Sequence, residues 1–270
     1  MCRCELACFF FRCFFFFASL PTLHNFSRCH QEGREGCTTR RVRTTTQAHT
    51  SPGVQYRPME RMEKPIMVIG TSAPRRREIA QRHFGAAYDL VYLSPAIDEK
   101  QIRDSDPFAL TSAIAQAKME ELRAKVARDT ALAHRIAHRP GSVAVTFDQV
   151  VNYHGEIREK PESQEQAVAF IKSYSNDNLA TVMTTVLYHF GTGKQASMPN
   201  TTLTFYGEIS DETVAHVVER GTCLHTAGGF VVEDADMKRC EVKIDPGTEE
   251  EVCGFCENSV RALLADVQRS

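Results

Sequence analysis

Short apolar runs alternate with helix-like segments from residue 65 to the C-terminus. Runs rich in Val, Ile, Tyr and Phe and bounded by turn residues predict strands, whereas apolar residues that recur every three or four positions predict helices. The predicted strands are 65–72, 88–94, 142–151, 179–190, 197–209, 227–232 and 240–245. The predicted helices are 74–85, 106–129, 163–175, 210–221 and 253–268, and residues 130–141 are predicted as a loop with some helix.

This alternation of strands and helices predicts an α/β fold with one main sheet. The two long strands around "GTGK" follow each other directly, which favours a mixed sheet over a purely parallel one. Several helix boundaries carry the expected signals: Pro74 suits a first turn, Gly85 suits a helix end, and Asp106 and Ser163 suit N-caps. One residue breaks the pattern, because Asp148 interrupts the Val-rich strand 142–151 and a buried carboxylate is costly without a partner.

Charge and composition divide the chain of 270 residues near Met59. Overall, 42% hydrophobic and 24% charged residues are typical of a soluble protein, and the net charge of −2 argues against a nucleic-acid-binding surface. The first 58 residues nevertheless hold eight Arg, no Lys and only three Glu, together with six of the ten Cys and eight of the sixteen Phe. We therefore expect an N-terminal extension over 1–60 and a folded domain over 65–270.

The extension has four open interpretations. Its clean apolar run, "CFFFFASL", is too short to span a bilayer but suits a signal peptide, whereas the Arg- and Thr-rich tract after it resembles a mitochondrial transit sequence. Alternatively it is a disordered extension, or translation begins at Met59 or Met62. The domain itself holds few cysteines, so a reduced, cytoplasmic setting is expected, with mitochondrial or secretory targeting left open.

Several clusters in the domain carry candidate chemistry. In "GTSAPRRR" a strand leads through Thr71 and Ser72 into a helix N-terminus, which is an anion-binding arrangement, and Arg75 and Arg76 follow in the first turn. A solvated basic helix face would also account for these arginines. Guanidinium groups bind phosphate in a bidentate manner, so this segment is a candidate phosphate site.

Carboxylates and lysines add to this inventory. Glu99 follows a predicted strand, Lys118 lies in an apolar helical stripe, and Asp148 and Lys160 flank a predicted hairpin. Each also has a structural interpretation. Glu99 could lie in an exposed acidic turn, Lys118 could extend to solvent, and Asp148 and Lys160 could form an ion pair. Together they supply cations for phosphates and carboxylates for a divalent metal and a water, which is the set that phosphoryl chemistry requires.

The order of these motifs resembles the Maf family of nucleoside triphosphate pyrophosphatases, which is related in fold to the inosine triphosphatases. The resemblance covers residues 65–266 and rests on "VIGTSAPRRREIA", "PAIDE", "AIAQAKMEEL", "VAVTFDQVVNYHGEIREKPESQEQAVAFIKSYS", "TVMTTVLYHF", "TLTFYGEISDETVAHVVERG" and "HTAGGFVVED". It implies a mixed, elongated central sheet flanked by helices, with two lobes and a cleft between them.

The resemblance also implies an activity. It is hydrolysis of nucleoside triphosphates, modified ones included, between the α- and β-phosphates to a monophosphate and pyrophosphate, which serves housecleaning of the nucleotide pool. The implied cofactor is a divalent cation, Mg²⁺ or Mn²⁺ with Co²⁺ as a further candidate. The implied partner is the triphosphate substrate. We expect no nucleic acid as a partner and no membrane for the folded domain, and a homodimer is a possible assembly.

The same resemblance assigns roles to individual residues. Asp148 and Glu99 are the catalytic and metal-binding carboxylates, with Asp148 as the proton acceptor. The expected substrate-binding residues are Thr71, Ser72, Arg75, Arg76, Lys118 and Lys160. The expected determinants of base choice are Arg75, Gln149 and Glu233.

The chain departs from the family pattern in two places. Ala73 stands where most members have Ser, and Gly254-Phe255-Cys256 replaces a usual Gly-Leu-Pro. The residues assigned to base choice combine features of the subgroup for dTTP and UTP with features of the subgroup for 7-methyl-GTP, UTP and CTP, so both preferences stay open. Two other functions also stay open: a nucleotide-binding regulator of cell division without turnover, and a redox or zinc role for the Cys253–Cys256 pair.

Overall fold

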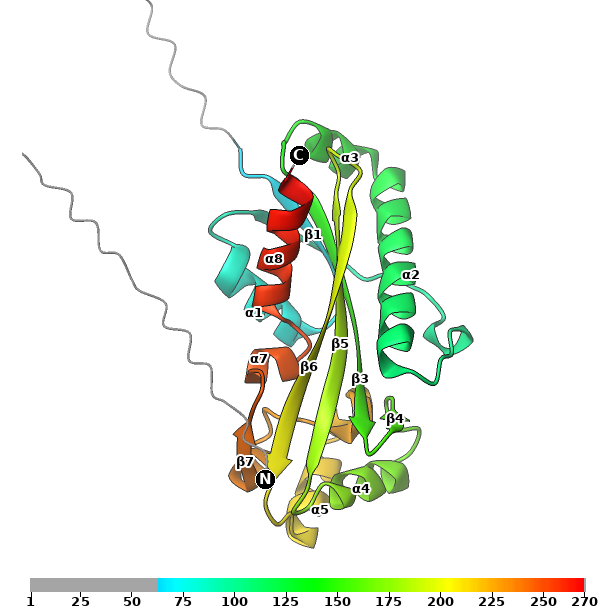
Figure 1. The fold of residues 1–270 in the computed structure, drawn as a ribbon, viewed down its shortest axis with the longest axis vertical. Coiled ribbons are helices and arrows are strands. Elements are labelled where there is room, and N and C mark those ends of the chain that lie inside the picture. The colour runs from blue at the N-terminus through cyan, green and yellow to red at the C-terminus, as the bar shows by residue number, and fades with distance from the viewer. Residues whose placement is uncertain (1–62, 270) are drawn as a thin grey trace, which may run out of the picture. The chain divides into compact units, whose positions relative to one another are not determined.

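The computed structural model describes residues 63–269, which form a seven-stranded mixed sheet flanked by helices (Figure 1). The strands are β1 Ile66–Gly70, β2 Asp89–Leu93, β3 Val143–Tyr153, β4 Glu156–Arg158, β5 Asn178–His189, β6 Gln195–Tyr206 and β7 Glu241–Ile244. Their order is β2-β1-β3-β5-β6-β7, with β4 paired to β3. β1 runs parallel to β2 and β3, and the other pairs are antiparallel. The predicted α/β class and mixed sheet are confirmed.

Helices cover both faces of this sheet. They are α1 Pro74–Phe84, α2 Pro107–Arg128, α3 Thr130–Ala137, α4 Gln164–Ser173, α5 Asp211–Glu219, α6 Ala235–Cys240, α7 Glu249–Val252 and α8 Glu257–Gln268, with 3-10 turns η1 Glu99–Gln101, η2 Thr222–His225 and η3 Ala227–Gly229. In Figure 1, α2 lies along one side of β3 and β5, and α8 along the other, while α4 and α5 lie at the far end of the strands. Within residues 63–269, no helix combines the length and the apolar character needed to cross a membrane.

The two faces of β3 bury alternate residues, as a period of two requires. Ala144 packs with the buried residues of α2 and α3, whereas Val145 and Phe147 pack with those of α1 and α8. Further along β3, Val151 belongs to a separate core cluster with α4 and α5. A strand with both faces covered has an almost continuous apolar sequence. The charged Asp148 therefore stands out in this strand.

Part of one edge of β3 has no neighbouring strand. β1 pairs with β3 only as far as Gly70 opposite Thr146, and β4 begins to pair at Val151. In the part of the chain that the structure describes, Phe147 to Val150 therefore pair only with β5, on the opposite edge. The interruption lies beside the β1–α1 turn and brings Asp148 and Gln149 to an open border of the sheet.

Two local predictions need correction. Residues 130–137 form the regular helix α3, capped by the Asp129 carboxylate, which accepts from the Leu132 amide. Residues 227–232 are not a strand, because Gly228 and Gly229 have φ of 63° and 65°, which extended backbone excludes. A side chain at Gly228 would lie 2.9 Å from Val151 and 2.7 Å from the Tyr174 hydroxyl, so close packing of the chain requires glycine there.

Candidate functional site

A pocket of about 560 Å³ opens beside the interrupted edge of β3. The β1–α1 turn, α2, β3, residues 225–233 and the start of the α7–α8 connection form its walls. This volume lies within the range of small-molecule sites, roughly 300–1,000 Å³. All residues assigned to the site from the sequence line this pocket: Thr71, Ser72, Arg75, Arg76, Glu99, Lys118, Asp148, Gln149, Lys160 and Glu233.

Lys118 joins the two candidate catalytic carboxylates. Its Nζ lies 2.7 Å from Asp148 Oδ1 and 2.9 Å from Glu99 Oε1. The contact forms because Asp148 shares the face of β3 that α2 covers, where the next side chain on that face, Thr146, donates to the Ala115 carbonyl. Lys118 and Asp148 are 9% and 5% exposed, so the ion pair partly offsets the cost of burying either charge.

The environment of Asp148 favours proton uptake. Burial raises the pKa of its carboxyl above the ordinary value, Lys118 counteracts this, and Glu99 raises the pKa further. A carboxyl with a raised pKa is a stronger base than an ordinary aspartate once it is ionised. Glu99 reaches the pair from the short η1 turn, where the Asp98 side chain accepts from the Lys100 amide.

Arg76 presents a positive charge without a carboxylate partner. Within residues 63–269, none of the ion pairs shorter than 4.0 Å includes it, and its guanidinium carbon lies 5.7 Å from the centre of the Phe147 ring. Burial lowers the pKa of Arg76, and nearby Asp148 and Glu99 raise it in part. Arg76 is half-buried. Because a cation that is partly removed from water without a partner is costly, this position favours an anionic ligand.

Arg75 lies in a different environment, among carboxylates. Its guanidinium is 3.2 Å from Glu78, 3.9 Å from Glu233 and 3.7 Å from Glu249. A hydrogen bond with Cys253 is the main cause that raises its pKa. The two arginines, adjacent in sequence, therefore occupy different parts of the pocket wall.

Gln149 is held by the C-terminal part of the chain. Its Nε2 donates to the carbonyl oxygens of Glu251 and Val252, both at 3.1 Å. Both contacts come from the face of β3 opposite Asp148, because the two side chains alternate. The amide orientation is thereby fixed, and the Gln149 carbonyl oxygen remains to accept a hydrogen bond.

The hydroxyl and lysine candidates have simpler surroundings. Thr71 is buried, and its Oγ1 accepts from the Ala73 amide at 3.1 Å, so this hydroxyl shapes the turn before α1. Ala73 gives α1 no side-chain cap, which leaves first-turn amides available to an anion. Ser72 and Lys160 are exposed, and among the residues that the structure describes Lys160 makes no ion pair.

Sequence reasoning did not place Cys253 in the pocket. Burial, and then the Glu233 charge, raise the pKa of its thiol to about 12, so the protonated, weakly nucleophilic form prevails. Cys223, Cys240, Cys253 and Cys256 are free thiols. Within residues 63–269, the group of possible metal-ligating side chains that converges is His83, Glu250 and Glu257, with no cysteine in it. The redox and zinc interpretations therefore gain no support.

The fold and the pocket together define an α/β protein in which arginine, lysine and carboxylate side chains converge beside an interrupted sheet edge. A family model described as "Maf-like protein" matches residues 66–267, and the chain belongs to that family. A 7-methyl-GTP pyrophosphatase from Dictyostelium discoideum is 30% identical over 75% of this chain and 98% of its own length. A dTTP/UTP pyrophosphatase from Chlamydia trachomatis is 29% identical, over 62% of this chain and 78% of its own. Another from Salinibacter ruber is 26% identical, over 66% and 78%.

Proposed function

We propose that the protein hydrolyses nucleoside triphosphates between the α- and β-phosphates and releases a monophosphate and pyrophosphate. The observation that carries this proposal is the Lys118–Asp148–Glu99 group beside the unpaired Arg76 in one pocket. The names of the relatives, 7-methyl-GTP pyrophosphatase and dTTP/UTP pyrophosphatase, support the same reaction. Removal of such nucleotides from the cellular pool would be the biological role.

Each side chain has a role in this reaction. A water attacks the α-phosphorus, Asp148 accepts its proton, and the bond from the α-phosphorus to the bridging oxygen breaks so that pyrophosphate leaves. Arg76, Lys118 and Lys160 neutralise the charge that develops on the phosphates, which is the largest contribution in most phosphoryl transfers. Lys118 also orients the Asp148 carboxylate through their 2.7 Å contact.

The two carboxylates suit a divalent cation. Glu99 and Asp148 both contact Lys118 Nζ and line the pocket, and carboxylate oxygens are the ligands that Mg²⁺ and Mn²⁺ prefer. These two residues would hold the ion. When bound, it would neutralise phosphate charge and lower the pKa of a bound water.

Base choice is proposed for the wall opposite Asp148, where Gln149, Arg75 and Glu233 lie. The fixed Gln149 amide leaves its carbonyl oxygen as an acceptor, which suits an amino or imino group of a base. The Glu233 carboxylate would favour a cationic 7-methylguanine, whereas its 3.9 Å contact with Arg75 reduces that preference. We propose that both pyrimidine and 7-methylguanine triphosphates enter the pocket.

A pyrophosphate-release assay tests the reaction. The full-length protein would be given UTP, dTTP, CTP and 7-methyl-GTP with Mg²⁺ or Mn²⁺, and the products would be separated by chromatography. We expect equimolar monophosphate and pyrophosphate. Tight binding without release of either product would instead favour the nucleotide-binding regulator, and release of orthophosphate would contradict cleavage between the α- and β-phosphates.

A further inference from the structure

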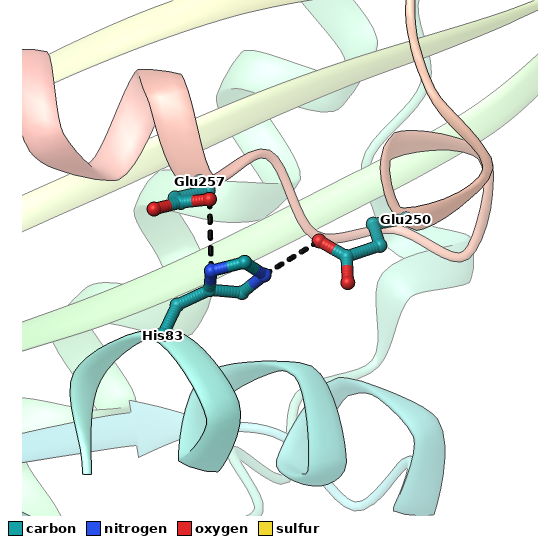
Figure 2. A group of neighbouring side chains, drawn as sticks. All are labelled: His83, Glu250 and Glu257. Carbon is teal, nitrogen blue, oxygen red and sulfur yellow. Dashed lines mark hydrogen bonds and ion pairs between the residues drawn. The ribbon is translucent and has the colours of Figure 1, made fainter. Parts of the chain in front are cut away.

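His83, near the end of α1, lies between two carboxylates of the C-terminal segment (Figure 2). Its Nε2 is 2.7 Å from Glu250 Oε2, and its Nδ1 is 2.8 Å from Glu257 Oε2. All three side chains are between 21% and 28% exposed. We call this group, His83 with Glu250 and Glu257, the His83 clamp. It joins α1 to α7 and α8, and it lies outside the pocket described above.

The clamp requires a protonated imidazole. Ionised carboxylates only accept hydrogen bonds, and a neutral imidazole has one donor and one acceptor nitrogen. Both hydrogen bonds can therefore form together only when both ring nitrogens carry hydrogen. The other charged groups that face the clamp are Arg82, which pairs with Glu250, and Arg261, which pairs with Glu257 and donates to the His83 carbonyl.

The same geometry argues against a metal ion at this place. The two carboxylates approach opposite nitrogens of one ring (Figure 2), whereas a shared ion would need both of them beside the same nitrogen. Each carboxylate is also already paired with an arginine. The contacts are therefore those of a closed ion-pair network that fastens two parts of the chain together.

The fastened segment, residues 249–257, contributes Val252 and Cys253 to the wall of the pocket. Gly254 lies against the Arg76 guanidinium so closely that an added Cβ would be 2.3 Å from Arg76 Nη2. The carbonyls of Glu251 and Val252 accept from Gln149. Because Arg76 is on α1, its position relative to Gly254 depends on the attachment of this segment to α1.

We propose that His83 is a positioning residue: the protonated clamp holds segment 249–257 against α1 and thereby keeps Arg76 and Gln149 in place for substrate. The effect on turnover rests on the proposed function, whereas the effect on the segment does not. The imidazolium makes both contacts, whereas a neutral ring keeps only one of them. The attachment of segment 249–257 is therefore stronger with the protonated ring than with the neutral ring.

Two variants test this proposal. His83→Gln can donate to one carboxylate only, and kcat/KM should fall by about 10- to 100-fold, the scale of a misplacement of roughly 1 Å in an active site. In Glu250→Gln the new amide can donate to a neutral His83 nitrogen, so the clamp no longer needs a protonated ring. His154→Asn is the matched control, because His154 pairs with Asp177 at 2.7 Å and does not line the pocket.

The decisive readout is kcat/KM measured from about pH 5 to about pH 9. Wild type and His154→Asn should share an alkaline decline that Glu250→Gln lacks. Hydrogen exchange at residues 249–257 supplies a readout without turnover, and it should be faster in His83→Gln than in wild type. Unchanged exchange in His83→Gln, or the same alkaline decline in Glu250→Gln, would overturn the proposal. A wild type that releases no pyrophosphate would overturn the proposed function, and hydrogen exchange would still decide on the clamp.

Discussion

Replacement of Gly254 by alanine should displace the Arg76 guanidinium without unfolding the protein. A Cβ at this position would lie 2.3, 2.6 and 2.8 Å from Arg76 Nη2, Nε and Cζ. Ordinary contact begins at 3.4 Å, so the guanidinium must move by about 1 Å. Because Arg76 is a flexible side chain, we expect it to move and the surrounding backbone to remain.

Two costs follow from this substitution. Gly254 has a φ of 85°, and a non-glycine residue in the left-handed region costs about 1–2 kcal/mol of unfolding free energy. If Arg76 binds phosphate as proposed, its displacement by about 1 Å should reduce kcat/KM by about 100-fold. The loss of activity should therefore exceed what the loss of stability explains.

A matched control separates the two costs. Gly155 has a φ of 88° and nothing within 4 Å of an added Cβ, so Gly155→Ala carries the same backbone strain without the contact. Urea unfolding and pyrophosphate release would be measured on both variants. We expect similar stabilities with about 100-fold lower kcat/KM in Gly254→Ala. Equal kcat/KM in the two variants would show that the contact between residue 254 and Arg76 does not affect turnover.

Three further predictions follow from buried charges and hydrogen bonds. Lys118→Met leaves two carboxylates without their common partner and should cost about 3–5 kcal/mol of unfolding free energy in urea. Adding Asp148→Asn to this variant should restore part of the lost stability. If the stability losses of the two single variants simply add in the double variant, the ion pair is contradicted. Gln149→Glu would set a carboxylate 3.1 Å from two carbonyl oxygens. It should lower the melting temperature by the equivalent of about 1–3 kcal/mol of stability. An unchanged melting temperature would show that these contacts contribute nothing to stability. A hydrogen bond from His154, followed by those from the Asn178 amide and the Tyr153 hydroxyl, lowers the pKa of Asp177 to about 2. These hydrogen bonds to ionised Asp177 therefore stabilise the folded protein above the ordinary pKa of aspartate, and this stabilisation is lost as pH falls toward about 2. Asp177→Asn should cost about 1–2 kcal/mol of unfolding free energy in urea at neutral pH. A cost that persists at about pH 2 would contradict this assignment.

Local patterns predicted the elements that depend on nearby residues. Helix α2 begins where Asp106 and Pro107 indicate, and the Asp106 carboxylate accepts from the Phe108 amide. The strand around Asp148 was likewise evident from its β-branched residues. The 3-10 turn η3 was missed because "GGFVV" has strand-like composition, whereas the contacts that force positive φ at Gly228 come from Val151 and Tyr174, distant in sequence.

In the site, too, the sequence predicted individual residues but not the contacts that depend on tertiary packing. Arg76, Lys118 and Asp148 were identified as candidates from their types and motifs, but the contact that joins Lys118 to Asp148 depends on how α2 lies on β3. Cys253 was missed as part of the pocket, and Gly254 as a neighbour of Arg76, because they reach Arg75 and Arg76 only through tertiary packing. His83 offered no spacing signal, since its two partners lie more than 160 residues away in the chain.

The role of Asp148 as proton acceptor can be tested by comparing pyrophosphate release by wild type and by Asp148→Asn. Asn is nearly isosteric with Asp and cannot accept the proton of the attacking water, so turnover should fall by about 100-fold or more. Circular dichroism would confirm that the variant is folded, and UTP, dTTP and 7-methyl-GTP would serve as substrates. We expect pyrophosphate from wild type and its near-complete loss in the variant. A folded Asp148→Asn protein that releases pyrophosphate at the wild-type rate would contradict this role of Asp148.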